Sequence, residues 1–138
     1  MATFLFDQVI FGPVWSRRLG ESLGINLLPA GRKYCNFNCI YCECGLTPHE
    51  LKSDSMPDVA TVKKLLDDKL QELHQEKGYL DAITFAGNGE PTLHPRFSEI
   101  MDQTIESRNR LFPSAKIAVL SNATTIQSDT TFQALLKA

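Results

Sequence analysis

The sequence predicts an α/β fold in which parallel strands alternate with helices. Three short apolar runs, each with the character of a buried strand, are followed along the chain by segments with helical periodicity. A strand-then-helix order repeated in series implies parallel strands joined by right-handed crossovers, as in an α/β barrel or a doubly wound sheet. The polar insertions all follow strands, and chemistry in such folds collects at the carboxyl ends of the strands.

The core strands are expected where short apolar runs stop at turn residues. An earlier apolar stretch, Phe4 to Trp15, is interrupted at Gly12-Pro13 and predicts an N-terminal strand or hairpin ahead of the main fold. The predicted core strands are Ser22–Leu28, Tyr79–Ala86 and Lys116–Leu120. Between the first strand and the first helix, the polar segment from Arg32 to Met56 predicts a long loop, and long loops in compact domains are usually functional.

Three helices are expected from apolar spacing and caps. The first is capped by Asp58 or Ser55, ends at Gly78, and buries one face. The second spans about Pro95 to Arg110, and the third starts at Ser128 or Asp129 and still runs at Ala138. The predicted buried positions of the first two helices are Val59, Val62, Leu65, Leu66, Lys69, Leu70 and Leu73, then Phe97, Ile100, Met101, Thr104 and Ile105.

Length and composition set the class of protein. The 138 residues suit one domain, and 43% hydrophobic with 22% charged residues is typical of a globular chain. A formal charge of −2 excludes a global basic field that would recruit nucleic acid. No run approaches the roughly 18 to 20 apolar residues of a membrane span, and Met1 to Ile10 lacks the pattern of a signal peptide. We therefore expect a cytoplasmic protein with no membrane partner.

The four cysteines lie between Cys35 and Cys44, in the predicted loop. Because thiols stay reduced in the cytoplasm, we interpret these four cysteines as metal ligands in preference to disulfide partners. Cys35, Cys39 and Cys42 are separated by three and then two residues, and three thiolates are one short of a closed metal site. If they hold three irons of a 4Fe–4S cube, the fourth iron is open to a small molecule.

Cys44 leaves a second interpretation open. Four thiolates can make a closed zinc site in a structural α/β module, although one residue between Cys42 and Cys44 is tight for two ligands of one ion. We interpret Cys44 as a neighbour of the site. An electron-transfer iron–sulfur protein is a third alternative.

The cysteine spacing, with the aromatic Tyr41 just before the last ligand, resembles the cluster motif of the radical SAM superfamily. The resemblance implies a 4Fe–4S cluster on Cys35, Cys39 and Cys42 and S-adenosylmethionine (SAM) on the open iron, cleaved reductively to give a 5′-deoxyadenosyl radical. It implies a reductant such as flavodoxin or ferredoxin. It also implies a partial TIM-type (β/α)6 barrel, of which residues 1–138 would be one truncated radical SAM domain with the first three strand-helix units; the bare edge of three parallel strands also indicates a fragment.

Two further segments match the superfamily. Gly87-Asn88-Gly89-Glu90-Pro91 follows a predicted strand and resembles the Gly-Gly-Glu-Pro turn that holds the amino group of SAM, with Asn88 where a first glycine is common. Ser121 and Asn122, at the end of the third strand, correspond to polar groups near SAM in related enzymes. The structural alternatives are an ordinary strand-to-helix turn at each place, with Glu90 as a helix-start carboxylate, and His94 as a surface or capping residue. No catalytic residue is assigned.

A last segment, Ser16 to Gly24, contains adjacent Arg17 and Arg18. Such arginines are usually solvated, but they can also meet a carboxylate, a phosphate or RNA. Together with Gly-Asn-Gly-Glu-Pro-Thr, this segment resembles the branch of radical SAM proteins that includes the wyosine tRNA-modifying enzymes. The resemblance suggests tRNA base modification as a first guess for an unidentified substrate.

Overall fold

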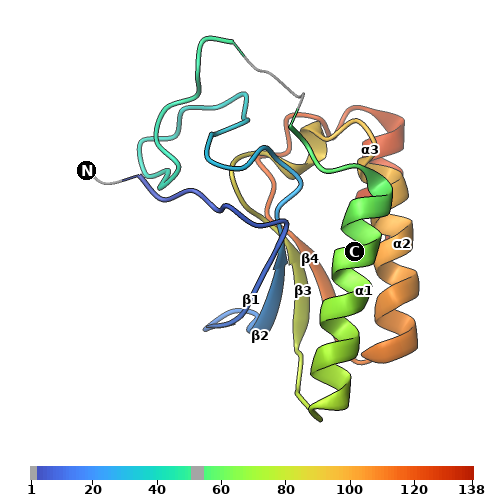
Figure 1. Cartoon of the computed structure of the whole chain (residues 1–138). Coiled ribbons are helices and arrows are strands. Elements are labelled where there is room, and N and C mark those ends of the chain that lie inside the picture. The colour runs from blue at the N-terminus through green and yellow to red at the C-terminus, as the bar shows by residue number, and fades with distance from the viewer. Residues whose placement is uncertain (1–2, 51–54) are drawn as a thin grey trace.

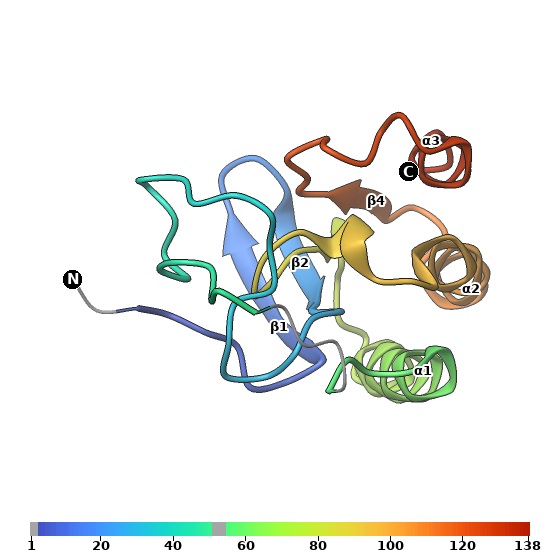
Figure 2. The ribbon, with the colours of Figure 1, turned by 90° about the horizontal axis from the view of Figure 1, so that it is seen from above.

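The computed structural model describes residues 3–50 and 55–138, and the fold is α/β as predicted. One sheet has the strand order β1-β2-β3-β4. Three helices lie along one face of this sheet, and the long cysteine-containing loop lies beyond the carboxyl ends of the strands (Figures 1 and 2). The strands are β1 (Ile10–Ser16), β2 (Gly20–Ile25), β3 (Ala82–Phe85) and β4 (Lys116–Val119), and the helices are α1 (Val59–Gln75), the 3-10 turn η1 (Pro91–Leu93), α2 (Phe97–Leu111) and α3 (Asp129–Leu135).

The pairing of the strands confirms the predicted parallel arrangement. β2, β3 and β4 pair in parallel, with Ile25 opposite Phe85 and Phe85 opposite Val119. β1 pairs with β2 in the antiparallel direction, so the N-terminal hairpin forms with the first core strand itself. β4 forms one edge of this four-stranded sheet.

The strands are shorter than the apolar runs that predicted them. β2 ends at Ile25 because the side-chain oxygen of Asn26 accepts the backbone N–H groups of Leu28 and Asn88, both at 3.2 Å, and turns the chain away. Asn26, Leu27 and Leu28 are nevertheless buried. Tyr79 is exposed and lies before β3. The apolar runs therefore predict which residues are buried, whereas hydrogen bonds determine where each strand ends.

One face of the sheet and the inner stripes of the helices form the core. Leu23 and Ile25 of β2 and Ile83 and Phe85 of β3 are each fully buried, at alternating positions of their strands. Helix α1 begins as predicted at Asp58, whose carboxylate accepts the N–H of Thr61 at 2.7 Å. It buries Val62, Leu66, Leu70 and Leu73.

Four positions of the predicted helical stripes are not fully buried in the core. Val59 and Ile105 are only partly buried, Leu65 is 39% exposed, and Lys69 pairs with Glu72 on the surface. A helix packed on a sheet buries a stripe narrower than its full set of apolar positions, and these four residues lie at its margins.

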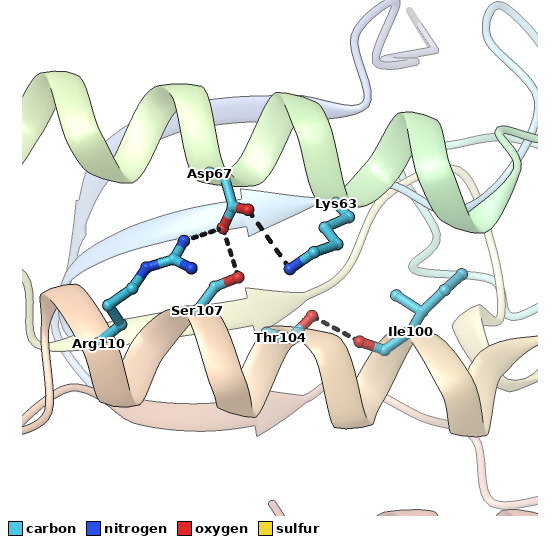
Figure 3. A network of polar contacts seen from close by, with 6 residues as sticks. All are labelled: Lys63, Asp67, Ile100, Thr104, Ser107 and Arg110. Atoms are coloured by element: carbon cyan, nitrogen blue, oxygen red, sulfur yellow. Dashed lines mark hydrogen bonds and ion pairs between the residues drawn. The ribbon is translucent and has the colours of Figure 1, made fainter.

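A polar network joins α1 to α2 outside this core (Figure 3). The carboxylate of Asp67 accepts hydrogen bonds from the hydroxyl of Ser107 and the guanidinium of Arg110, and it lies 3.4 Å from the ammonium of Lys63. Burial opposes ionisation of Asp67, but these donors and cations outweigh it and lower the pKa of the carboxyl.

Helix α3 ends earlier than predicted. The last two amides, of Lys137 and Ala138, bond to carbonyls three residues back, at 3.2 Å each, which tightens the final turn and stops the α-helix at Leu135. The prediction that the helix still runs at Ala138 is therefore wrong.

The predicted long loop is present between β2 and α1, and its described part, 26–50 and 55–58, contains neither helix nor strand. Residues 51–54 of that prediction lie outside the described residues. Within the described ranges, no helix is long and apolar enough to cross a membrane.

Candidate cofactor site

A depression of about 620 Å³ at the carboxyl ends of the strands contains most of the residues that the sequence singled out, although Asn88 and Pro91 are buried and do not line it. We call it the cysteine depression. It brings together the long loop, the turn after β3 and the end of β4, segments that are far apart in the sequence (Figure 1). Its lining includes Arg18, Lys33, Cys35, Cys39, Tyr41, Cys42, Cys44, Gly87, Gly89, Glu90, Ser121 and Asn122.

All four cysteines are free thiols. Cys35 is buried, and the other three are half-buried. Tight turns hold the loop, because Cys42 donates its N–H to the carbonyl of Cys39 at 3.0 Å and Gly45 donates to Cys42 at 3.2 Å. Among the described residues, however, no three Cys, His, Asp or Glu side chains converge closely enough to hold a metal ion. The thiols share one depression without being drawn into a ligand set.

Cys44 contacts the glycine turn. Its thiol donates to the carbonyl of Gly87 at 3.6 Å, which ties the cysteine loop to the segment after β3. Burial, followed by the neighbouring Cys42, raises the pKa of the Cys44 thiol to about 11. Cys44 therefore links the cysteine loop to the glycine turn, and its interpretation as a neighbour of the site stays a prediction.

Lys33 is a buried cation beside these thiols. Only 3% of its surface is exposed, and its ammonium donates to the carbonyl of Gly45 at 2.9 Å. A buried ammonium has three donors and is costly to bury without negative charge nearby. Sequence reasoning missed Lys33 because a lysine before a cysteine loop is ordinarily solvated, and nothing in the pattern signals its burial.

The turn after β3 requires its glycines. Gly87 and Gly89 have φ angles of +139° and +138°. A Cβ on Gly89 would lie 2.0 Å from the carbonyl oxygen of Tyr34, so the turn and the start of the cysteine loop run in close contact. Two hydrogen bonds fix this contact: Tyr34 donates to the carbonyl of Asn88 at 2.7 Å, and Glu90 donates to the carbonyl of Tyr34 at 3.1 Å.

Asn88 holds the N-terminal segment, residues 3–9, against this turn. Its fully buried side chain accepts the N–H of Phe6 at 2.7 Å and donates to the carbonyl of Phe6 at 2.7 Å. It also donates to the carbonyl of Pro29 at 2.9 Å. These three bonds give a physical reason for an asparagine where a glycine is common, since glycine has no side chain to make them.

Glu90 connects the turn to the end of β4. Its carboxylate, 2% exposed, accepts the hydroxyl of Ser121 at 2.7 Å and the N–H of Asn122 at 2.6 Å. It also accepts the hydroxyl of Thr92 at 2.7 Å and caps η1, whose first residue is the buried Pro91. Both readings of Glu90 are therefore realised, because one carboxylate orients the turn and caps the following helical turn.

Asn122 links the end of β4 to the first cysteine. Its side-chain amide donates to the oxygen of Asn36 at 2.9 Å and lies 3.7 Å from the sulfur of Cys35. Tyr41 is 84% exposed at the edge of the depression, where its hydrogen bond to Cys39 and the charge of that thiol raise the pKa of the phenol.

Arg18 and His94 match their structural alternatives at least in part. Arg18 is exposed, as expected of a solvated arginine, and it also lines the cysteine depression from the β1–β2 hairpin. His94 is 5% exposed and is not a surface residue, but the capping alternative is confirmed, because His94 is the C-cap of η1 and donates its N–H to the carbonyl of Pro91 at 3.1 Å. Its ring bonds to the carbonyl of Pro57 at 2.8 Å and accepts a hydrogen bond from the N–H of Arg96 at 3.0 Å. His94 therefore joins the start of α1 to the start of α2, and it does not line the cysteine depression.

The comparison with known families defines the class. The radical SAM superfamily matches residues 33–138, which include the cysteines, the glycine turn and β4, and the chain belongs to this superfamily.

Among curated proteins, the chain is similar to several UPF0026 proteins and to one protein with a different name. It is 37% identical over 127 residues to a UPF0026 protein of Helicobacter pylori, covering 92% of this chain and 39% of that protein. It is 38% identical over 92 residues to a UPF0026 protein of Methanocaldococcus jannaschii, covering 66% of this chain and 27% of that protein. A protein named GTPase Obg in Brachyspira hyodysenteriae is 40% identical over 92 residues, covering 67% of this chain and 13% of that protein. The chain thus spans well under half the length of these relatives, and no solved structure matches it.

Proposed function

We propose that Cys35, Cys39 and Cys42 hold a 4Fe–4S cluster and that the cysteine depression binds SAM against its open iron. The observation that carries this proposal is the convergence, in one depression, of three superfamily features: the three cysteines, the Gly87–Pro91 turn, and Ser121 with Asn122. These features come from three separate strand ends, and only the fold brings them together.

The residues present fit such a cluster. Three thiols are the donor set of a cube with one open iron, and Cys39 and Cys42 are half-buried while Cys35 is buried; the loop would have to draw the three sulfurs together to hold the cluster. The ammonium of Lys33 lies beside the thiols, with one carbonyl as its hydrogen-bond acceptor. A cluster on thiolates would supply the negative charge that a buried ammonium favours. When bound and reduced, the cluster would pass one electron to SAM and break a carbon–sulfur bond, giving methionine and the 5′-deoxyadenosyl radical.

The chain's own residues would bind and orient the cosubstrate. The carbonyl of Gly89 has no hydrogen-bond donor among the described residues, so it is free to accept a bond from an ammonium group. Glu90 holds the turn at a fixed position relative to Ser121 and Asn122. Asn122 in turn contacts Cys35, so that the ammonium acceptor and the first cysteine are parts of one bonded unit.

The finer assignments belong to the same proposal. We propose that the sheet is the first part of a (β/α)6 barrel within a single radical SAM domain and that the rest of the barrel supplies further contacts. A reductant such as flavodoxin or ferredoxin would deliver the electron. For the substrate, the wyosine-like branch makes RNA a first candidate, supported by Arg18 at the edge of the cysteine depression.

The test is anaerobic reconstitution with iron and sulfide, followed by iron analysis and the EPR spectrum of the reduced protein with and without SAM. We expect about four irons per chain and a SAM-dependent change of the spectrum. Cys39→Ala should abolish the cluster, and the matched Cys44→Ala should retain it. One tightly held zinc with no response to SAM would support the structural zinc module, and a cluster that ignores SAM would support electron transfer.

A further inference from the structure

A second cavity of about 440 Å³ lies on the face of the sheet opposite the core. We call it the inner cavity. Its sheet side is formed by Ser22 and Gly24 of β2 and by Thr84 and Ala86 at β3, which alternate with the buried residues Leu23, Ile25, Ile83 and Phe85 of the core. The small side chains of Ser22, Thr84 and Ala86 leave room for a ligand, whereas the ring of Phe11 packs against Gly24.

The opposite side of the inner cavity is aromatic. Phe6 stacks on Phe11 with ring centres 3.8 Å apart, and Phe4 meets Phe6 edge-on at 4.9 Å. Gly24 makes this possible, because a Cβ there would lie 2.2 Å from the ring of Phe11. The bonds from Asn88 to Phe6 hold this aromatic group in place.

The sheet side carries one polar feature. The hydroxyls of Ser22 and Thr84 are 2.7 Å apart, and both residues are buried. Whichever hydroxyl donates to the other, the accepting hydroxyl keeps a hydrogen that no described residue takes up. The pair therefore offers a single hydrogen-bond donor to a ligand.

The described residues that line the inner cavity disfavour an anionic ligand. Among the described residues that line it, Glu43 and Cys44 are the ionisable ones, and none is basic. A phosphate or carboxylate placed inside would lose water without gaining a cation. By contrast, Arg18 and Lys33 line the neighbouring cysteine depression.

The two spaces adjoin. Cys44, Gly87, Gly89 and Leu120 line both the inner cavity and the cysteine depression. A group in the inner cavity therefore lies next to the place where the proposed radical would form.

We propose that the inner cavity binds the reacting part of the substrate and that this part is a neutral, apolar ring with one hydrogen-bond acceptor directed at the Ser22–Thr84 pair. This inference rests on the proposed function, because it names the class of substrate that would react at the proposed cluster and SAM site. Any phosphate that the substrate carries stays outside the inner cavity, on the side of Arg18.

The first test uses two fluorescent probes of nearly the same shape on the cluster-free Cys39→Ala chain. Neutral N-phenylnaphthylamine should bind, and the anionic anilinonaphthalenesulfonate should bind about tenfold more weakly or less, because no lining cation receives the sulfonate. Equal binding of the two probes would overturn the proposal.

The second test locates the probe. Ala86→Leu places a larger side chain in the inner cavity and should weaken N-phenylnaphthylamine about tenfold. Ala60→Leu is the matched control, because it makes the same exchange at an exposed residue of α1 that does not line the cavity. Equal affinity in the two variants would place the probe elsewhere and contradict the proposal.

A third test is insensitive to partial loss of folding, because it compares two ligands of one protein. The unsubstituted chain should prefer naphthol over methylnaphthalene, and the Ser22→Ala/Thr84→Val double variant should lose that preference. If the double variant kept the preference for naphthol, the claim that the Ser22–Thr84 pair donates a hydrogen bond to the ligand would be wrong.

The last test separates this inference from the proposed function. In the reconstituted protein, the cluster should quench the emission of bound N-phenylnaphthylamine, because the two spaces adjoin. Probe binding without quenching in protein that holds four irons would refute the substrate role. Failure of SAM to change the EPR spectrum would refute the proposed function while leaving the probe results standing.

Discussion

The helical face of the sheet and the carboxyl ends of its strands differ in how their parts are held together. On the helical face, fully buried apolar side chains such as Leu66, Ile83 and Ile100 pack against one another, and these contacts are not directional. At the carboxyl ends of the strands, single polar side chains join segments that are far apart in the sequence: Asn88 to Phe6 across 82 residues, and Glu90 to Asn122 across 32. The helical face resists unfolding, whereas the hydrogen bonds at the carboxyl ends fix the positions of a few atoms.

The difference teaches where substitutions should act. A substitution on the helical face changes the packed volume and should lower the stability of the whole fold. A substitution at the carboxyl ends of the strands removes a specific hydrogen bond and should loosen only the two segments that the bond joins. The four predictions below test this division, from the largest expected effect to the smallest.

Ile83→Ala should lower the free energy of unfolding by about 2–5 kcal/mol, because it opens a space in the core next to α1 and α2. The matched variant is Ile40→Ala, at a residue that is 94% exposed, which should change stability by less than about 0.5 kcal/mol. Urea unfolding followed by circular dichroism measures both. Similar midpoints for the two variants would contradict the assignment of Ile83 to the core.

Glu90→Gln should lower the free energy of unfolding by about 2–3 kcal/mol, because the amide NH2 that replaces one carboxylate oxygen would face either the hydroxyls of Ser121 and Thr92 or the N–H of Asn122. The control is Glu76→Gln, an exposed residue after α1. Urea unfolding of the cluster-free protein gives the stability. If Glu90→Gln behaved like Glu76→Gln, the carboxylate would not be the link between the turn and β4.

Asn88→Ala should cost about 2 kcal/mol and act locally, because three hydrogen bonds to the N-terminal segment and Pro29 are lost. Hydrogen exchange at the amide of Phe6 should become faster, while exchange in α1 and α2 stays slow. The matched Asn109→Ala, at an exposed position of α2, should leave the Phe6 amide protected. If hydrogen exchange became uniformly faster across the chain in Asn88→Ala, the carboxyl ends of the strands and the helical face would not respond separately to substitution.

Asp67→Asn should lower stability by about 1 kcal/mol at neutral pH, since it weakens the network with Ser107, Lys63 and Arg110. The pKa of Asp67 lies below its ordinary value of 3.8, so its contribution is present above that pH and is lost as the pH falls through the lowered pKa. The difference in the free energy of unfolding between the unsubstituted chain and Asp67→Asn should therefore vanish in acid, as measured by urea unfolding at a series of pH values. Asp68→Asn, which removes an exposed i,i+4 pair with Lys64, should cost less, about 0.3–0.5 kcal/mol.

The same division explains what the sequence could predict. The helical face leaves a periodic pattern, which predicts α1 and the parallel strands correctly; the cap is Asp58, one of the two candidates, and the helix ends at Gln75, three residues before the predicted Gly78. The strand ends were not predicted correctly, because Asn26 stops β2 through hydrogen bonds to residues that no pattern connects.

At the site, the rule that chemistry follows strand ends was enough to expect the cysteines, the glycine turn and Asn122 near one another. The burial of Lys33 and the bonds of Asn88 to Phe6 could not be foreseen, because each depends on a single long-range contact. The ligand roles of Cys35, Cys39 and Cys42 stay predictions until a cluster is measured.

The bond between Phe6 and Asn88 also has a consequence for the order of events on the ribosome. Synthesis adds about 5–20 residues per second, and the two partners are 82 residues apart. The three phenylalanines of the N-terminal hairpin region are therefore made several seconds before the asparagine that secures them. During that interval they are exposed apolar side chains, the kind of surface that nascent-chain chaperones bind.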